Sequence, residues 1–196
     1  MRTLHLNEIF YSLQGEGYRA GHPSIFVRLA GCDLKCNFCD TEFASWAPVS
    51  LEDLAKRIDD LRTGCRWIVW TGGEPALQLT AEDITFFKDK GFKQAIETNG
   101  NNPVPPGIDW VACSPKVAEH VVSKNLPDGV DELRYVRHAN QPGLPRPKVS
   151  ADYHYLSPMF DGNQVNPANM AHVIKLCLEN PRWKLSTQTH KLHKIL

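Results

Sequence analysis

Segments rich in β-branched and aromatic residues alternate with segments of helical periodicity along most of the chain. The strand-type segments are residues 25–30, 67–71, 92–98, 108–113, 132–136, 153–156 and 184–188. Parallel strands must be joined by crossover connections, and helices of this length provide them. The alternation therefore predicts an α/β fold built from parallel βαβ units.

Capping residues mark where the intervening helices begin. Each has a side chain that can accept a hydrogen bond from the first helical turn, and apolar residues follow it at helical spacing. These residues are Ser50, Thr80 and Asn166. The matching stop signals are Gly64, Gly91 and Pro181. The glycines and prolines between residues 126 and 147 read as loops around one strand, so we expect a single domain over residues 1–196.

The composition is that of an ordinary globular domain with a full core. The chain has 196 residues, 42% of them hydrophobic, and its 22 Lys and Arg balance 22 Asp and Glu. A net charge of zero gives no positive field to attract phosphates. The sequence contains neither an apolar run of the roughly 20 residues that span a bilayer nor the apolar core of a signal peptide. We therefore expect a cytoplasmic protein that acts on a small molecule, with neither nucleic acid nor membrane as a partner.

Cys32, Cys36 and Cys39 lie close together directly after the first strand-type segment. Such a density of thiolates is typical of a metal site. A structural zinc site needs a fourth ligand, for which His22 is a candidate, whereas a four-iron cluster held by three thiolates keeps one iron open for chemistry. On spacing alone, an iron–sulfur cluster, a zinc site and redox-active thiols all stay open. The isolated cysteines read as small apolar core residues, and they are Cys65, Cys113 and Cys177.

The spacing C-x3-C-x2-C, with Phe38 directly before the last cysteine, resembles the signature of the radical S-adenosylmethionine (SAM) superfamily. The resemblance implies a partial, incomplete parallel β/α barrel with the cluster loop after the first strand. It also implies a 4Fe-4S cluster on Cys32, Cys36 and Cys39, with SAM bound to the open iron. Reduction then cleaves SAM to methionine and a deoxyadenosyl radical, so the difficult chemistry belongs to the cofactors.

A glycine-rich motif, Thr71-Gly72-Gly73-Glu74-Pro75, follows the next strand-type segment. Its glycines allow the backbone to approach a ligand closely, and its carboxylate can accept hydrogen bonds from an ammonium group. On its own, this motif also fits a simple turn with a charged tip. Beside the cysteines, it resembles the motif with which the superfamily binds the amino group of SAM, and Glu74 is then the implied ligand of that amine.

Further motifs resemble the 7-carboxy-7-deazaguanine synthase family, in their order along nearly the whole chain. They are segments 8–17, 26–28, 39–41, 97–100, 114–116 and 186–191. This resemblance implies ring contraction of 6-carboxy-5,6,7,8-tetrahydropterin to 7-carboxy-7-deazaguanine, with release of ammonia and a requirement for Mg²⁺. The pathway implied is the biosynthesis of queuosine and other 7-deazapurines.

The resemblance implies that the pterin substrate is bound by residues with suitable hydrogen-bond donors and acceptors. Gln14 can donate and accept while Glu16 only accepts, a combination that suits the edge of a heterocycle. Arg28 has a planar fork of donors that matches the substrate carboxylate. Thr41, a hard oxygen donor two residues past Cys39, is the implied Mg²⁺ ligand. The complete implied substrate set is Leu13, Gln14, Gly15, Glu16, Arg28, Thr98, His190 and the terminal Leu196.

Besides Glu74, the resemblance implies that residues in several loops contact SAM. One is the cysteine loop, and the others follow later strand-type segments. The implied residues are Phe38, Cys39, Asp40, Gly100, Ser114, Pro115, Lys116, Ser157, Pro158, Met159 and Phe160. In this last stretch, Ser157 stands where relatives often have Gln, and Phe160 is an additional residue.

The same resemblance implies a homodimer and a reductant such as flavodoxin or ferredoxin. Two other readings stay open at this point. An activating enzyme that places a glycyl radical on a partner protein also uses the C-x3-C-x2-C spacing, but it gives no reason for the 14–17 and 188–191 motifs. An electron carrier or a zinc-stabilised binding module would need no SAM at all.

Overall fold

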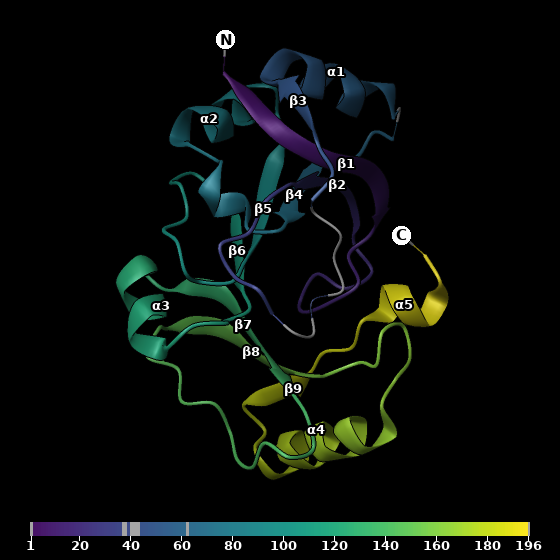
Figure 1. Ribbon diagram of the computed structural model, residues 1–196, viewed down its shortest axis with the longest axis vertical. Helices are drawn as coiled ribbons and strands as arrows, with labels where there is room; N and C mark the ends of the chain where they lie inside the picture. Colours follow the sequence, from purple (N-terminus) through teal and green to yellow (C-terminus); the bar gives the residue numbers. More distant parts are fainter. Residues whose placement is uncertain (1, 37–38, 40–43, 62, 196) are drawn as a thin grey trace. The chain divides into compact units, whose positions relative to one another are not determined.

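The computed structural model describes residues 2–36, 39, 44–61 and 63–195. Its residues form two compact units, through both of which the chain passes more than once (Figure 1). The first unit consists of Met1–Ser12, Pro23–Thr98 and Asn102–Val111, and the second of Leu13–His22, Asn99–Asn101 and Ala112–Leu196. The expected single domain over residues 1–196 stays a prediction.

The first unit contains a mostly parallel sheet. Its strands are β1 (Thr3–Leu13), β2 (Pro23–Leu29), β3 (Ala47–Ser50), β4 (Trp67–Gly72) and β5 (Lys93–Thr98). They lie in the order β3-β1-β2-β4-β5. Strands β2, β4 and β5 run parallel, whereas β1 and β3 pair antiparallel. This parallel arrangement brings the carboxyl ends of β2 and β4 to the same edge of the sheet.

Two helices, α1 (Leu51–Asp60) and α2 (Ala81–Asp89), and a short 3-10 helix, η1 (Pro75–Leu77), complete the first unit. The expected caps are confirmed: the Ser50 side chain accepts a hydrogen bond from the Asp53 amide at 3.1 Å, and Thr80 forms a capping box with Asp83. In the core, the buried indole of Trp70 donates to the side chain of Gln94 at 2.9 Å.

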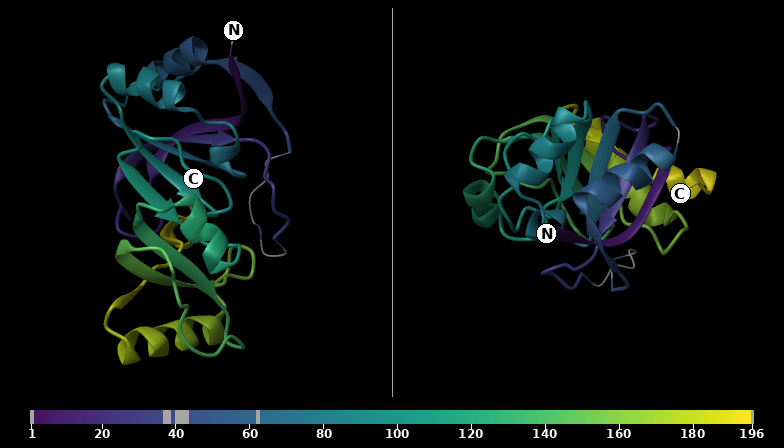
Figure 2. Two further views of the ribbon diagram at one scale, coloured as in Figure 1. Left: turned by 90° about the vertical axis from the view of Figure 1, so that its left-hand side faces the viewer. Right: turned by 90° about the horizontal axis from the view of Figure 1, so that it is seen from above.

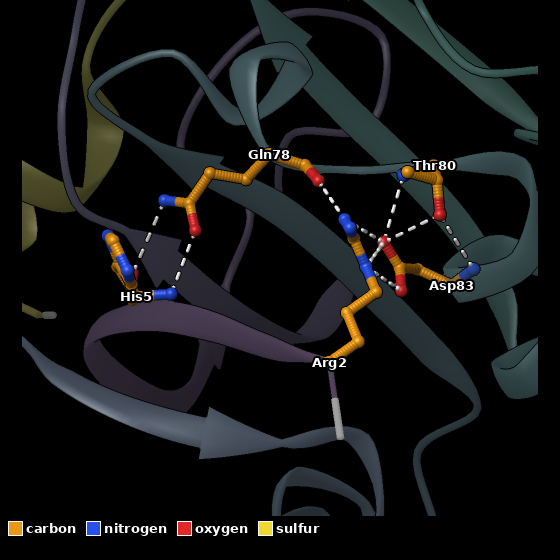
Figure 3. A network of polar contacts seen from close by, with 5 residues as sticks. All are labelled: Arg2, His5, Gln78, Thr80 and Asp83. Carbon is orange, nitrogen blue, oxygen red and sulfur yellow. Dashed lines mark hydrogen bonds and ion pairs between the residues drawn. The ribbon is translucent and has the colours of Figure 1, made fainter.

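A polar network joins the start of β1 to the region between η1 and α2 (Figure 3). The guanidinium of Arg2 contacts both carboxylate oxygens of the buried Asp83, with Nη2 2.8 Å from Oδ2, and it also donates to the Gln78 carbonyl. The Gln78 side chain in turn accepts from the His5 amide at 2.8 Å. The Asp83 carboxylate also accepts a hydrogen bond from the Thr80 amide at 2.9 Å, so it both caps α2 and binds Arg2 at the start of β1.

The second unit is built on parallel strands β6 (Trp110–Cys113, of which Ala112 and Cys113 belong here), β7 (Val130–Arg137), β8 (Ala151–Pro158) and β9 (Trp183–Leu185). Its helices are α3 (Glu119–Asn125), α4 (Pro167–Glu179) and α5 (Thr189–His193). Helix α4 begins at the expected cap Asn166, whose side chain accepts from the Asn169 amide at 3.0 Å, and it packs against β8 and β9 (Figure 2).

The expected α/β class with an open, mostly parallel sheet is confirmed. Among the described residues, β3 and β9 each pair on one side only, so the strands do not close into a barrel. Each expected strand is present, but the expected strand over 184–188 is wrong in its second half, because β9 ends at Leu185 and the chain turns into α5. In the described part of the chain, no helix combines the length and apolar character needed to cross a membrane.

Candidate active site

The cysteine loop leaves the end of β2 through Gly31, which has a φ of 82° that favours glycine. Cys32 and Cys36 are half-buried and Cys39 is exposed; the Cys39 amide donates to the Cys36 carbonyl at 3.1 Å. Burial raises the pKa of the Cys32 thiol. All six cysteines of the chain are described and carry thiols rather than disulfides.

The glycine motif after β4 packs directly against the start of the cysteine loop. The Gly73 amide donates to the Leu29 carbonyl at 3.0 Å, and the Glu74 amide donates to the Gly31 carbonyl at 2.8 Å. A Cβ atom on Gly73 would lie 3.0 Å from the Cβ of Cys32. The structure therefore brings together two motifs that the sequence separates by some forty positions.

Glu74 is a fully buried carboxylate at this contact, with a relative exposure of 0%. One of its oxygens accepts the Ala76 amide at 3.0 Å and so caps η1. A carboxylate has about four lone-pair positions, and the Ala76 amide occupies one of them.

The sulfur donors fit an iron–sulfur cluster by their chemistry, since thiolates are the usual ligands of such clusters. Gly72 and Gly73 allow the backbone of Leu29 and Gly31 to lie directly against the motif, because that backbone fills the space a Cβ atom would need. In the described part of the chain, no three His, Cys, Asp or Glu side chains are grouped as a metal site. The binding of iron by the three cysteines stays a prediction. Four further expected site residues, Phe38, Asp40, Thr41 and Leu196, lie outside the described residues.

Two expected substrate residues also belong to the first unit. The Arg28 guanidinium, near the end of β2, donates to the Glu8 carboxylate at 2.6 Å, and it lies over the ring of Phe10. Thr98 ends β5 and is buried. Another contact, which the sequence did not indicate, holds the cysteine loop: the Asn102 side chain donates to the Asp33 carboxylate at 2.7 Å.

In the second unit, the segment Gln14-Gly15-Glu16-Gly17 packs against the segment 186–191 near the other end of the chain. The Gly15 carbonyl accepts from the amide and the hydroxyl of Thr189, at 3.0 and 2.8 Å. The Gly17 amide donates to the Ser186 hydroxyl at 3.0 Å. A Cβ atom on Gly15 would lie 2.0 Å from Nδ1 of His190, so only glycine fits beside this ring. The structure thereby brings Gly15, Glu16 and His190 into one region, and their binding of substrate stays a prediction.

A buried charged cluster supports the same segment from β7. Arg134 contacts Glu16 through Nε and Glu132 through Nη1, each at 2.9 Å. The second oxygen of Glu132 accepts the Tyr18 amide at 2.9 Å. Burial raises the pKa of Glu132, and Arg134 opposes that shift. The sequence analysis missed this cluster, although opposite charges two residues apart in a strand, on either side of Leu133, were an available signal.

Expected SAM contacts also lie in the second unit. The Lys116 ammonium donates to the Ser114 carbonyl at 2.9 Å and to its hydroxyl at 2.5 Å, while the Lys116 amide donates to Asn99 at 3.1 Å. Gly100 has a φ of 80°, and a Cβ atom there would meet the Cys113 sulfur at 3.0 Å. The structure therefore places Gly100 and the 114–116 segment near one another.

The remaining expected SAM contacts follow β8. Ser157 is buried, and among the described residues its hydroxyl has no hydrogen-bond partner. The same holds for Nε of Arg137, at the end of the neighbouring strand β7, and the Arg137 carbonyl accepts the Met159 amide at 2.8 Å. Phe160 lies under the Lys191 ammonium, 5.6 Å from its ring centre. Arg137 is a polar residue at this position that the sequence analysis did not identify.

Comparisons with known proteins agree with these motifs. A family model described as Radical SAM superfamily matches residues 26–112. The 7-carboxy-7-deazaguanine synthase of Bacteroides thetaiotaomicron is 35% identical over 187 residues, which are 95% of this chain and 96% of the relative. That of Haemophilus influenzae is 37% identical over 198 residues, covering 97% and 93%. The crystal structure of QueE from Escherichia coli has a TM-score of 0.72 at 26% identity and covers 96% of this chain and 95% of that chain.

Proposed function

The chain belongs to the 7-carboxy-7-deazaguanine synthase family of radical SAM enzymes, and on this basis we propose that it converts 6-carboxy-5,6,7,8-tetrahydropterin to 7-carboxy-7-deazaguanine with release of ammonia. The pathway is the biosynthesis of queuosine and other 7-deazapurines. The observation that carries the proposal is the match to relatives of this name over nearly the full length of both chains.

The proposed cofactors are a 4Fe-4S cluster, SAM and Mg²⁺. Cys32, Cys36 and Cys39 would hold the cluster, Glu74 would bind the SAM amine, and Thr41 would contribute to Mg²⁺ binding. When bound, the cluster and SAM supply the one-electron chemistry that starts hydrogen abstraction from the substrate. The buried Glu74 supports this assignment, because a carboxylate and an ammonium group form a strong, charge-assisted hydrogen bond when they are shielded from water.

The protein's own contribution is to bind and orient the pterin. Gln14 and Glu16 would pair with its pyrimidinone edge and Arg28 with its carboxylate, while Thr98 and His190 would line the ring. Orientation matters here because a radical reacts with whatever lies within near-attack distance, roughly 3–3.5 Å. The fixed backbone of the 14–17 segment, bonded to Ser186 and Thr189, supports this role.

Partners and location are proposed from the same family. We propose a homodimer in the cytoplasm that receives electrons from flavodoxin or ferredoxin and acts on the pterin as a small molecule. SAM contacts of Ser114, Pro115, Lys116 and the 157–160 stretch are proposed likewise.

An anaerobic assay tests the function. The cluster is reconstituted, dithionite, SAM, Mg²⁺ and 6-carboxytetrahydropterin are added, and the products are identified by mass spectrometry. Formation of 7-carboxy-7-deazaguanine is expected. Deoxyadenosine without this product would contradict the substrate and favour another radical reaction, such as that of an activating enzyme. If neither product forms, the result would contradict SAM chemistry and favour an electron carrier or a zinc-stabilised binding module.

A further inference from the structure

Arg134 is enclosed by two carboxylates that come from different parts of the second unit. Its Nε contacts Glu16 and its Nη1 contacts Glu132, and the side-chain exposures of Arg134, Glu16 and Glu132 are 6%, 17% and 2%. Glu132 and Arg134 both lie on β7, whereas Glu16 lies in the segment expected to bind the substrate. The guanidinium is therefore a direct link between the strand and the Glu16 side chain.

Glu132 fixes the backbone beyond Glu16. Besides contacting Arg134, it accepts the Tyr18 amide at 2.9 Å. Gly17 has a φ of 69°, and a Cβ atom there would lie 1.9 Å from Oε1 of Glu132. The chain thus lies directly on this carboxylate, where no larger residue than glycine fits. Glu132 holds the main chain of the segment, and Arg134 holds the side chain of Glu16.

We infer that Arg134 is a positioning residue that holds the Glu16 carboxylate in place as an acceptor for the amino-pyrimidinone edge of the pterin. The inference rests on the proposed function and adds a determinant of substrate choice to it. Arg134 occupies one of about four acceptor positions of the Glu16 carboxylate, so the group can still accept the ring N–H and the 2-amino group of the substrate.

The charges explain why a cation is needed at this place. Glu132 lies on the far side of Arg134, and without the guanidinium two carboxylates would face each other in a poorly hydrated region. Glu16 would then lose the partner that fixes its orientation. A Glu16 side chain that turns away from Glu132 would no longer face a substrate edge that donates hydrogen bonds, and this would weaken binding.

Stability alone does not require such an arrangement. Buried ion pairs gain little over apolar residues of similar volume, because the loss of hydration offsets the attraction. The Arg134 cluster is instead well suited to fixing the Glu16 side chain in one orientation.

The test compares two ligands that differ only at the edge in question. One is 6-carboxypterin, a stable, oxidised and fluorescent analogue of the substrate, and the other is 6-carboxylumazine, in which a carbonyl replaces the 2-amino group. Binding to the reconstituted holoenzyme is measured by fluorescence titration for the wild type, Arg134→Gln and Arg134→Lys. We expect Arg134→Gln to bind 6-carboxypterin about 10-fold or more weakly and to lose its preference over 6-carboxylumazine. Arg134→Lys, which keeps the charge, should recover part of both.

Turnover provides a second readout that a general loss of structure would not give. Arg134→Gln should raise KM for the pterin, while the slow cleavage of SAM without substrate stays at the wild-type rate. Arg2→Gln is the control, since it removes a guanidinium that pairs with a buried carboxylate in the first unit and should leave the ligand preference unchanged. If Arg134→Gln fails to fold, Glu16→Gln keeps the size of the side chain and should lose the same preference.

The outcomes are separable from those of the proposed function. A wild type that makes 7-carboxy-7-deazaguanine, together with an Arg134→Gln variant of unchanged affinity and preference, would overturn the inference and leave the function intact. A wild type that binds neither ligand and makes no product would overturn both.

Discussion

Gly73 lies so close to Gly31 that a Cβ atom on Gly73 would stand 1.9 Å from the Gly31 carbonyl oxygen. The next amide in the chain, that of Glu74, donates to the same carbonyl at 2.8 Å. The ends of two parallel strands are therefore joined at the point where the cysteine loop begins, and any displacement of Gly73 must move Cys32.

Replacement of Gly73 by alanine should push the cysteine loop away from β4. We expect a destabilisation of about 1–3 kcal/mol, typical of overpacking, together with a loss of bound iron after reconstitution. Iron and sulfide content and the thermal midpoint measure the two effects. Gly91→Ala is the control, because it puts a side chain at a positive φ with nothing within 4 Å. An iron content in Gly73→Ala equal to that of the control would contradict the prediction.

Glu74→Gln should separate SAM binding from folding. A glutamine side chain can still accept the Ala76 amide, so η1 should keep its cap and the protein its thermal midpoint. The loss of negative charge should weaken SAM binding about 10-fold or more, because a charge-assisted bond to the amine is lost. Equilibrium dialysis of SAM with the reconstituted enzyme measures this. The exposed Glu52→Gln serves as the control, and equal affinities of the two variants would refute the role of Glu74.

Asp83→Asn should lower the stability of the first unit. The Asp83 carboxylate is fully buried and accepts hydrogen bonds from Arg2 and from the Thr80 amide. Asparagine has the same size but cannot form the ion pair with Arg2. Arg2 is about half exposed, which limits the cost to about 1–2 kcal/mol. Urea denaturation measures the change, with the exposed Asp89→Asn on the same helix as the control. The prediction fails if both variants unfold at the same urea concentration.

Acidification should destabilise the second unit through His154. This buried ring packs edge-on against Trp183, and its Nε2 accepts from Arg182 at 3.1 Å. Burial, with a contribution from Arg182, lowers the pKa of His154 below its ordinary 6.5. His154 therefore binds a proton more readily in the unfolded chain than in the folded one. The stabilisation by neutral His154 is complete above pH 6.5, and it is lost as the pH falls towards the pKa of His154 in the folded protein.

Urea denaturation at pH 7.5 and pH 5.5 checks this sign. The difference in unfolding free energy between the two conditions should be smaller in His154→Gln than in the wild type, because the variant cannot take up the proton. An identical pH dependence in the two proteins would show that His154 does not contribute.

Much of the fold was predictable because its signals are local. The caps Ser50, Thr80 and Asn166 and the apolar strands that alternate with their helices are set by short-range patterns, and the structure confirms them. Strand β1 was missed because polar residues interrupt its alternation after Leu6, and β3 and α3 were missed because they are short. The antiparallel pairing of β1 with β3 links distant segments, which periodicity cannot indicate.

Only those parts of the site that belong to recognisable sequence motifs could be predicted. The family is confirmed by the relatives, and the contact between the cysteine loop and the Gly72–Glu74 turn follows from their positions at the ends of parallel strands. The partners of the motif residues come from elsewhere in the chain. The alternation Glu132-Leu133-Arg134 could have indicated a charge pair on β7, but Arg134 binds Glu16 over a long sequence separation, so no local pattern could have identified that contact. The individual roles of the site residues stay predictions.

Under the proposed function, Glu8 competes with the substrate carboxylate for Arg28. Arg28 already has a carboxylate partner at 2.6 Å before any substrate arrives. A ligand with a carboxylate of its own can replace Glu8 and leave the guanidinium fully paired, whereas an uncharged ligand would gain nothing from Arg28. With Arg28 as the proposed partner of the substrate carboxylate, the Arg28–Glu8 pair would favour the carboxylated pterin over pterins that lack the acid.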